Sequence, residues 1–464
     1  MVTFHEQGDG SVLAAMKGAP EVVLGYCSDE LLAGTQDMNE SRHEEINEVN
    51  IHMAKMALRS LAFAYQVIPK GELADFKQQT EAGKAGFIFA GLAGMIDPPR
   101  PEVKKAVDLC KQAGIRVLMA TGDHQLTAEV IARDLGIMDE GGQALNGADL
   151  ETMSDEELLE ALQETNVFAR VSPEHKHRLV EALQSQQQVV TMTGDGVNDA
   201  PALKAAQVGV AMGITGTDVA REASEMVLTD DNFASIVNAV EEGRVVFQNV
   251  RKVVKFLLAT NIGEDLTILA SLLLFSGVGL ILTPVQILWI NLVTDGILDI
   301  TIAMEPKEGD VMEEDPRPLR SRIINREMWI NTVLVSINMA IGSLFVFHLG
   351  TQTGSIDHAR TMVFTTMAMF QVFNAFNVRS RTKSLFQMNF FGNPYLLGAV
   401  IVSVTLQILT SQLPFMNRIL DTVPLTFDDY LLIVPVSATI LVVSEVIKWV
   451  WARIRAKRAA KSHA

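Results

Sequence analysis

Apolar residues are distributed differently in the two halves of the chain. Up to about residue 250, short apolar stretches alternate with charged stretches, as in a water-exposed domain. From residue 253 onward, long and nearly uncharged apolar runs follow one another. Because about 20 apolar residues are enough for a helix to cross a bilayer, this change predicts a soluble part followed by a membrane part.

The first 95 residues have the pattern of a mixed domain of strands and helices. Strands are predicted at 11–16, 59–65 and 86–94, and the period of residues 42–58 predicts a helix. The sequence DPPRP follows at 97–101. Proline fixes its own φ and restrains the residue before it, so this stretch predicts a stiff connector and a domain boundary near residue 96.

Residues 102–236 alternate between helix and strand patterns. Helices are predicted at 102–114, 126–135 and 156–164, and strands at 115–120, 167–170, 188–192, 208–212 and 226–228. Ser172 followed by Pro173 and Glu174 predicts the start of a further helix. Such an alternation is typical of a parallel, doubly wound α/β sheet.

Six apolar segments in the second half are long enough to be membrane spans. They lie at 253–275, 284–303, 329–349, 359–378, 394–413 and 430–451. A buried core helix is a poor explanation for so many long apolar runs together. The charged stretch at 237–252 predicts a helical stalk that continues into the first span.

Basic residues are concentrated in alternate loops of this half. Between the second and third spans, between the fourth and fifth, and after the last, these are Arg317, Arg320, Arg322 and Arg326, then Arg379, Arg381 and Lys383, then Arg453, Arg455, Lys457 and Arg458. Because cytoplasmic loops carry the excess of Lys and Arg, the pattern predicts that the soluble half and the carboxyl terminus are cytoplasmic.

The overall composition excludes one class of function. The 464 residues include 38 Lys and Arg against 55 Asp and Glu, which gives a net charge of −17 and argues against nucleic-acid binding. Cys27 and Cys110 are far apart in the sequence, which suggests no disulfide framework and fits a reducing compartment.

A polar turn lies between a predicted strand and a predicted helix at residues 193–201, where the sequence is TGDGVNDAP. Ligands of open α/β sheets bind at this carboxyl edge of the strands. Glycines let the backbone approach a ligand, and Asp195 and Asp199 supply the carboxylate oxygens that Mg²⁺ prefers. For a shorter pattern of this kind, an ordinary Asn/Asp/Gly turn without a ligand would be as good an explanation as a Mg²⁺ site.

Two other strand ends bring polar residues to the same edge. Thr121, Gly122 and Asp123 follow the strand at 115–120, and the helix after the strand at 167–170 carries Lys176. Together with Asp195, these residues provide a hydroxyl, an ammonium group and a Mg²⁺ ligand, which phosphoryl transfer requires for positioning and charge neutralisation. Taken alone, Lys176 is more typical of an exposed surface lysine.

Polar side chains also occur inside three of the predicted spans. Because such side chains are costly in the hydrocarbon of a membrane, those that are retained often have a function. They are Asn261, Glu264 and Asp265 in the first span, Asn291, Thr294, Asp295 and Asp299 in the second, and Gln371 and Asn374 in the fourth. Spacings of three and four place members of each set on one helix face. This favours ion coordination for the carboxylates, whereas hydrogen bonding between helices is an equal explanation for Gln371 and Asn374.

The nine residues at 193–201 resemble the hinge signature of the P-type ATPases, ion pumps that phosphorylate themselves on an aspartate. The sequence KGAPE at 17–21 is similar to the nucleotide-domain motif of these pumps, in which the lysine lines the adenine pocket. Arg59 falls where the family has an arginine that faces the nucleotide phosphates. The three strand ends together resemble the haloacid-dehalogenase-like phosphorylation domain of the family.

The resemblance implies a role for each matching residue. The catalytic set would be Thr121, Gly122, Asp123, Lys176, Asn198 and Asp199. The ATP-binding set would be Lys17, Arg59, Thr121, Gly122, Asp123, Arg170 and Lys176. Mg²⁺ would be held by Asp195 and Asp199, so ATP and Mg²⁺ are the expected cofactors.

The resemblance also implies a domain plan. Residues 1–95 would be the carboxyl-terminal part of a nucleotide-binding domain, 96–236 an incomplete phosphorylation domain, 237–252 a stalk, 253–451 a bundle of about six membrane helices, and 452–464 a basic tail. The nucleophile of the family is the aspartate of a DKTGT stretch on the first strand of the phosphorylation domain, and neither DKTGT nor the TGES stretch of the actuator domain occurs in this sequence. We therefore expect a gap near the centre of the phosphorylation sheet.

Two stretches of the spans resemble the ion-binding helices of calcium pumps of the sarcoplasmic-reticulum and secretory-pathway types. They read NIGE at 261–264 and NLVTDG at 291–296. The resemblance implies that Asn261, Glu264, Asn291, Thr294 and Asp295 bind the transported cation, and oxygen ligands of these kinds suit Ca²⁺. Gln371 stands where two-calcium pumps have a glutamate, and Asp265 and Asp299 where they have apolar residues, so Na⁺, Mn²⁺ and proton-coupled transport remain alternatives.

The sequence thus predicts the carboxyl-terminal part of a bacterial-type P-type ATPase in the cell membrane, with Ca²⁺ as the transported ion and no turnover by this chain alone. A second hypothesis is a non-catalytic membrane subunit that pairs with a separate amino-terminal half. A third, a phosphatase with a membrane anchor, requires a nucleophilic aspartate of its own, and intramembrane Glu264 and Asp295 argue against it.

Overall fold

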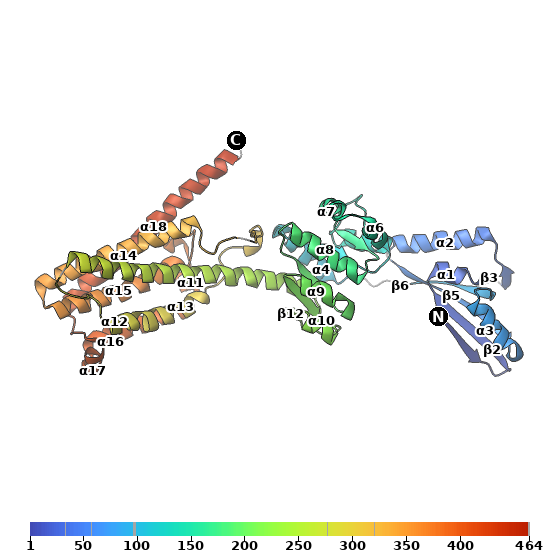
Figure 1. Ribbon diagram of the computed structural model, residues 1–464, viewed down its shortest axis with the longest axis horizontal. Helices are drawn as coiled ribbons and strands as arrows, with labels where there is room; N and C mark the ends of the chain where they lie inside the picture. The colour runs from blue at the N-terminus through green and yellow to red at the C-terminus, as the bar shows by residue number, and fades with distance from the viewer. Residues whose placement is uncertain (33, 57, 96–98, 276, 320, 463–464) are drawn as a thin grey trace. The chain divides into compact units, whose positions relative to one another are not determined.

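The computed structural model describes residues 1–32, 34–56, 58–95, 99–275, 277–319 and 321–462. The chain divides into two compact units, Met1–Asn238 with Met312–Leu319, and Ala239–Val311 with Arg320–Ala464. The described strands all belong to the first unit, and the second is built of helices (Figure 1). The predicted change from a mixed to an apolar helical chain near residue 250 therefore falls close to the boundary between the units. Asp97 and Pro98 of the predicted connector lie outside the described residues.

The amino-terminal part of the first unit is a six-stranded sheet with the order β1-β2-β5-β6-β3-β4. The strands are β1 Val2–Glu6, β2 Ser11–Gly18, β3 Cys27–Leu31, β4 Thr35–Asp37, β5 Arg59–Pro69 and β6 Phe87–Met95. Alternate residues of β2 and β5, such as Met16 and Ala64, pack against Val23 of α1 (Pro20–Leu24) and Ile46 of α2 (Glu40–Lys55). A third helix, α3 (Leu73–Glu81), contributes Phe76 to this core.

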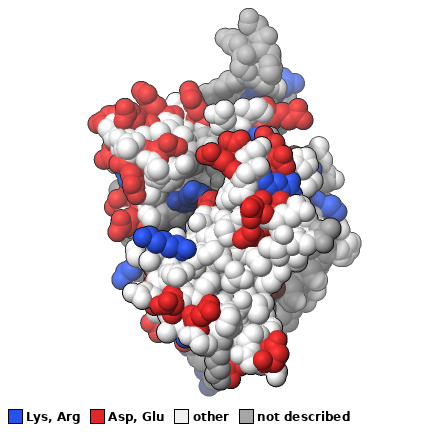
Figure 2. All heavy atoms as spheres, turned by 90° about the vertical axis from the view of Figure 1, so that its right-hand side faces the viewer, with Lys and Arg blue, Asp and Glu red and all other residues white. Residues whose placement is uncertain are grey.

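The other residues of β2 and β5 point away from this core because successive side chains of a strand alternate between its faces. Lys17 pairs with Phe63 in the antiparallel register of these strands, and both side chains are exposed. Figure 2, turned by 90° from Figure 1, shows several groups of acidic side chains with a few basic side chains between them and uncharged surface over much of the rest. The sheet therefore has one buried face and one open face.

Residues 101–228 contain six short parallel strands with helices between them. The strands are β7 Met119–Ala120, β8 Leu145–Asn146, β9 Val167–Ala169, β10 Thr191–Gly194, β11 Val208–Met212 and β12 Met226–Leu228. The helices are α4 Pro101–Gln112, α5 Gln125–Asp134, α6 Gly147–Thr152, α7 Asp155–Glu164, α8 Pro173–Ser185, α9 Ala200–Ala205 and α10 Asp218–Glu222. The predicted alternation of helix and strand is confirmed, and Ser172 caps α8 by accepting a hydrogen bond from the His175 N–H.

These strands form two sheets, β7-β9-β8 and β10-β11-β12, an interruption that is consistent with the gap expected near the centre of the phosphorylation sheet. Helices cover both faces of β9, because Val167 packs with Val107 of α4 whereas Phe168 packs with Leu162 of α7. Within the described part of the chain, no ladder joins β7 to β10. Since β7 pairs with β9 alone, only Met119 and Ala120 of the predicted strand at 115–120 have strand geometry.

The second unit is a bundle of helices, most of which begin or end close to the predicted spans (Figure 1). They are α11 Phe233–Leu274, α12 Pro284–Trp289, η3 Ile290–Asp295, α13 Gly296–Ala303, α14 Arg326–Thr353, α15 Ile356–Val378, α16 Pro394–Gln412, α17 Pro414–Leu420 and α18 Phe427–Ser462. The segment η3 is a π-helix. The predicted stalk and first span are parts of one uninterrupted helix, α11.

Among the described helices, five are long and apolar enough to cross a membrane by length and composition: α11, the run Pro284–Ala303, α14, α16 and α18. The fourth predicted span, 359–378, forms helix α15, which does not meet this criterion. The reason is that α15 carries polar residues such as Gln371 and Asn374, and it keeps them buried at the centre of the bundle. Its Val363, Phe364 and Phe370 belong to the main core of the unit.

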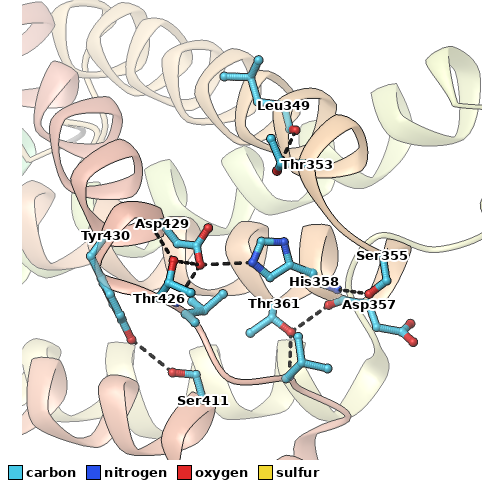
Figure 3. A network of polar contacts seen from close by, with 12 residues as sticks. Leu349, Thr353, Ser355, Asp357, His358, Thr361, Ser411, Thr426, Asp429 and Tyr430 are labelled. Carbon is cyan, nitrogen blue, oxygen red and sulfur yellow. Dashed lines mark hydrogen bonds and ion pairs between the residues drawn. The ribbon is translucent and has the colours of Figure 1, made fainter.

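A polar network joins the beginning of α15 to the beginning of α18 (Figure 3). The Nε2 atom of His358 lies 3.1 Å from Asp429 Oδ2, which also accepts hydrogen bonds from the backbone and the hydroxyl of Thr426 at 2.7 and 2.8 Å. Thr361 accepts a hydrogen bond from the Val423 N–H at 3.0 Å. These bonds fix the segment before α18 against α15.

Candidate functional site

The loops that follow β7 and β9 are bonded to each other through their backbones. The N–H of Arg170 donates to the carbonyl of Asp123 at 3.1 Å, and the N–H of Val171 donates to the carbonyl of Thr121 at 3.1 Å. The hydroxyl of Thr121 donates to the Asp123 carboxylate at 3.0 Å. Thr121, Gly122, Asp123 and Arg170 are thus brought together at one strand edge, as the sequence predicts.

Lys176 is paired with the second aspartate of the TGDGVNDAP turn. Its Nζ lies 2.7 Å from Asp199 Oδ1, and Asp199 Oδ2 accepts hydrogen bonds from the N–H groups of Asp195 and Gly196 at 3.2 and 3.1 Å. Asp199 is buried, whereas Asp195 and Asn198 are exposed. The structure therefore brings Lys176 to the turn that carries Asp195.

The two aspartates of this turn differ in what their carboxylates can still bind. Both oxygens of Asp199 are engaged, which favours a role in holding the turn and Lys176 in place. The carboxylate of Asp195 accepts no hydrogen bond from a described residue and is exposed at the end of β10. Its oxygens are therefore suitable for a hard cation such as Mg²⁺.

The surroundings of Asp199 change its acidity. Burial alone would raise the pKa of the Asp199 carboxyl, but the hydrogen bonds from Lys176, Gly196 and Asp195 outweigh it, and the pKa is lowered from its ordinary value of 3.8. A carboxylate with a lowered pKa stabilises the fold at pH values above its ordinary pKa. This contribution is lost as the pH falls through the lowered pKa.

We therefore predict that Asp199→Asn removes part of the acid sensitivity of this region. The difference in stability between the wild type and the variant should be constant above about pH 5 and should shrink below about pH 4. Hydrogen exchange of the β10 peptide, corrected for the intrinsic pH dependence of exchange, measures it. Asp195→Asn, at an exposed position of the same turn, is the matched control. Equal behaviour of the two variants would contradict the prediction.

Gly194 must be glycine because of its contact with Asp199. A Cβ at this position would lie 2.5 Å from the Cβ of Asp199, closer than any packed side chain allows. We predict that Gly194→Ala destabilises the first unit by about 1–3 kcal/mol, the usual cost of overpacking. Thermal unfolding followed with a thiol-reactive dye reports on this unit, because both cysteines are buried within it. Gly122→Ala, where a Cβ meets nothing within 4 Å, is the steric control for folding.

The two predicted nucleotide residues of the amino-terminal sheet belong to β2 and β5. Lys17 is exposed on β2. Arg59 is the first residue of β5 and pairs with Met95 in register, but its side chain lies outside the described residues. The structure therefore places Lys17 where a ligand can reach it.

In the second unit, polar residues of α15 and η3 converge on Glu264 of α11. Gln371 of α15 donates to Glu264 Oε1 at 3.0 Å, and Asn291 of η3 lies 3.5 Å from Glu264 Oε2. Close to them, Thr260 donates to Asp295 Oδ2 at 3.2 Å. Glu264 and Asp295 are only 3% and 1% exposed, so both carboxylates point into the bundle.

This polar centre has buried atoms without hydrogen-bond partners in the structure. They are Asp295 Oδ1, Asp299 Oδ1, Gln371 Oε1 and Asn374 Nδ2. Three of the four are oxygen acceptors, and a cation with oxygen ligands would satisfy them. Asn291, Thr294 and Asp295 lie in the π-helix η3, and π-helical turns are frequent at functional sites.

The predicted ligand set is only partly brought together. Glu264, Asn291 and Asp295 belong to the centre, and Thr294 is buried in the same π-helical segment. Asn261 instead is exposed and donates to the Leu257 carbonyl of its own helix at 2.8 Å. Within the described ranges, no three His, Cys, Asp or Glu side chains form a metal-binding group, so amide and hydroxyl oxygens are required for a cation site here.

The sequence interpretation missed Thr260 and the partner of Gln371. Thr260 lies one helical turn before Glu264, and a threonine at this place is also a common helix-packing residue, so its position alone carries no signal. The sequence marks Gln371 as a polar residue of a span, but its bond to Glu264 depends on how α15 packs against α11.

Comparison with protein families gives two matches along the chain. Residues 279–450 match the model described as "Cation transporting ATPase, C-terminus", and residues 1–102 match "P-type ATPase, cytoplasmic domain N".

Curated proteins similar to the chain carry related names. The chain is 41% identical over 443 residues to a calcium-transporting ATPase of Bacillus subtilis, which covers 94% of this chain and 49% of the relative. It is 42% identical over 438 residues to the cation-transporting ATPase pma1 of Synechocystis, covering 93% and 48%. It is 39% identical over 452 residues to the probable cation-transporting ATPase F of Mycobacterium bovis, covering 96% and 49%. The chain thus spans about half the length of the curated relatives it matches.

Proposed function

Because the chain belongs to the P-type cation-transporting ATPase family, a family of ATP-hydrolysing cation translocases, we propose that it is the carboxyl-terminal part of a pump that moves Ca²⁺ across a membrane. The chain is a multi-pass membrane protein. The observation that carries the proposal is the convergence of Gln371 and Asn291 on Glu264, whose side chain is buried in the bundle. A buried carboxylate with amide neighbours, and no basic partner among the described residues, is an arrangement suited to an ion passing through the membrane.

Ca²⁺ is the ion that these ligands suit best. It prefers several oxygen ligands in flexible geometry, and the centre offers carboxylates, amides and hydroxyls rather than thiols or imidazoles. The relative from Bacillus subtilis is named as a calcium transporter, whereas the name of the relative from Synechocystis states only a cation. Titration of the wild type with MnCl₂ and NaCl beside CaCl₂ therefore tests which ion the centre prefers.

The first unit would supply the chemistry that drives transport. ATP would bind near Lys17 and Arg59, and Mg²⁺ at Asp195. Thr121, Gly122, Asp123 and Arg170 would contact the phosphoryl group or the nucleotide from the β7 and β9 loops. Mg²⁺, when bound, neutralises phosphate charge. Asp199 would keep Lys176 and the Asp195 turn in position, and Asn198 would be a polar contact at the same edge.

The sequence contains no DKTGT stretch, so we expect no phosphoenzyme from this polypeptide alone. The test is phosphorylation with radiolabelled ATP, with and without co-expression of a polypeptide that carries this stretch. Acid-stable, Ca²⁺-dependent label is expected only in the second case, and on the co-expressed polypeptide. Cation-dependent ATP hydrolysis by the purified chain alone would contradict this account of the missing nucleophile.

A further inference from the structure

The polar centre of the second unit contains one carboxylate that the proposed ligand set does not use. Asp299 lies in α13, four residues after Asp295, so the two share a helix face. One oxygen of each, Oδ1, is buried and has no hydrogen-bond partner. The other oxygen of Asp295 accepts the Thr260 hydroxyl. The pair therefore presents two unsatisfied anionic oxygens along one side of α13.

No described cation neutralises this pair. Among the described residues, neither Asp295 nor Asp299 forms an ion pair with Lys, Arg or His, and the same holds for Glu264. Unpaired charges are costly in the interior of a membrane protein and are retained where they bind ions or protons. Glu264, Asp295 and Asp299 are carboxylates on α11, η3 and α13. The hydrogen bonds of this region leave Oδ1 of Asp295 and Oδ1 of Asp299 without a partner.

A second observation points to a ligand independently of the acidic residues. Gln371 is fully buried and uses its amide N–H on Glu264, which leaves its own oxygen without a donor. An amide held in this orientation offers an acceptor rather than a donor to whatever occupies the centre. The π-helix ends at Asp295 and regular helix begins at Gly296, so the hydrogen-bonding pattern of the backbone changes between the two aspartates.

We propose that Asp299 is a ligand of the transported divalent cation and forms with Asp295 a subsite one turn further along α13 than the Glu264 site. The inference rests on the proposed function and extends it, because it assigns a cation-binding role to a residue outside the predicted ligand set. The subsite would take Ca²⁺ through carboxylate oxygens, with Asp295 shared between it and the Glu264 site.

The test is Ca²⁺ binding to the full chain purified in detergent, measured by isothermal titration with CaCl₂. Asp299→Asn, which keeps the shape and removes the charge, should weaken Ca²⁺ binding about tenfold or more, and Asp299→Glu should bind more tightly than Asp299→Asn. Asp428→Asn, the same change at an exposed position near the start of α18, should bind like the wild type. Infrared difference spectra with and without Ca²⁺ should show a carboxylate band that is lost in Asp299→Asn.

The outcomes separate this inference from the proposed function. If Asp299→Asn binds Ca²⁺ like the wild type and keeps every carboxylate band, the inference is wrong while the pump assignment stands. If the wild type binds neither Ca²⁺, Mn²⁺ nor Na⁺, both are overturned. Tryptophan fluorescence on heating shows whether Asp299→Asn folds. If it does not, the infrared spectrum of Asp299→Glu decides. A glutamate that binds Ca²⁺ gives a Ca²⁺-sensitive band at a shifted frequency, and a glutamate that does not bind Ca²⁺ gives no such band.

Discussion

Glu264→Gln is expected to weaken Ca²⁺ binding by the purified chain about 100-fold, which corresponds to a loss of about 3 kcal/mol. The side chain is 3% exposed and is held from both sides by Gln371 and Asn291. The substitution removes a full negative charge from the ligands of a cation in this centre. Charge–charge interactions are strong there because the surrounding medium has low polarity. Titration of the detergent-purified chain with CaCl₂ measures the effect.

The control for this variant is Glu242→Gln. Glu242 lies in the same helix, α11, but is exposed, so the same change of charge there should leave Ca²⁺ binding unaltered. Equal loss in both variants would point to a general electrostatic effect rather than to a site. Unchanged binding in Glu264→Gln would remove Glu264 from the ligand set and with it the observation on which the proposed function depends.

Arg379→Met is expected to lower the free energy of unfolding of the second unit by about 3–5 kcal/mol. The Arg379 side chain is 3% exposed, and its Nε lies 2.9 Å from Glu305 Oε1. Its two other nitrogens donate to the carbonyls of Phe390 and Asn389, both at 3.2 Å. Removing the guanidinium leaves Glu305 as a buried charge without its partner, and this is the costly part of breaking a buried pair.

Intrinsic tryptophan fluorescence on heating or in denaturant measures this effect selectively, because all four tryptophans, at positions 289, 329, 449 and 451, belong to the second unit. The control is Lys307→Met, which breaks the ion pair with Glu241 at 2.6 Å. Since both members of that pair are partly exposed, the expected loss is below about 1 kcal/mol.

The double variant Arg379→Met with Glu305→Gln tests the physical reason. Neutralising Glu305 removes the unpaired charge, so the double variant should be more stable than Arg379→Met alone. If the two losses simply add, the cost comes from packing of the long side chain and the argument from charge is wrong.

Much of the candidate phosphate site could be predicted from the sequence because its parts are local. The TGDGVNDAP stretch follows a strand and precedes a helix, and parallel strands bring their carboxyl ends to one edge. The bond between Lys176 and Asp199 agrees with that prediction and excludes the arrangement in which Lys176 and Asp195 lie on opposite sides of the domain. The local pattern could not show that the carboxylate of Asp199 is hydrogen-bonded whereas that of Asp195 is exposed, since both are Asp residues in one turn.

The ion centre was predictable in its helix faces but not in its contacts. Spacings of three and four residues place Glu264 with Asn261 and Asp295 with Asp299, yet Asn261 bonds to its own helix and Thr260 is the residue that reaches Asp295. Helix α15 gave the weakest membrane signal of the six predicted spans, because its polar residues lower its hydropathy while neighbouring helices cover them.

The sequence by itself determined which segments are helices, strands and apolar runs, and which residues are candidates for phosphate or cation chemistry, because these properties depend on neighbours along the chain. Only the tertiary structure decided which of the six parallel strands pair with one another, that Gln371 turns its amide N–H towards Glu264, and that Asp299 keeps an unsatisfied oxygen inside the bundle. The physical reason is that hydrogen-bond partners and burial are set by segments far apart in the sequence, and side-chain identity alone does not specify the rotation at which two helices meet.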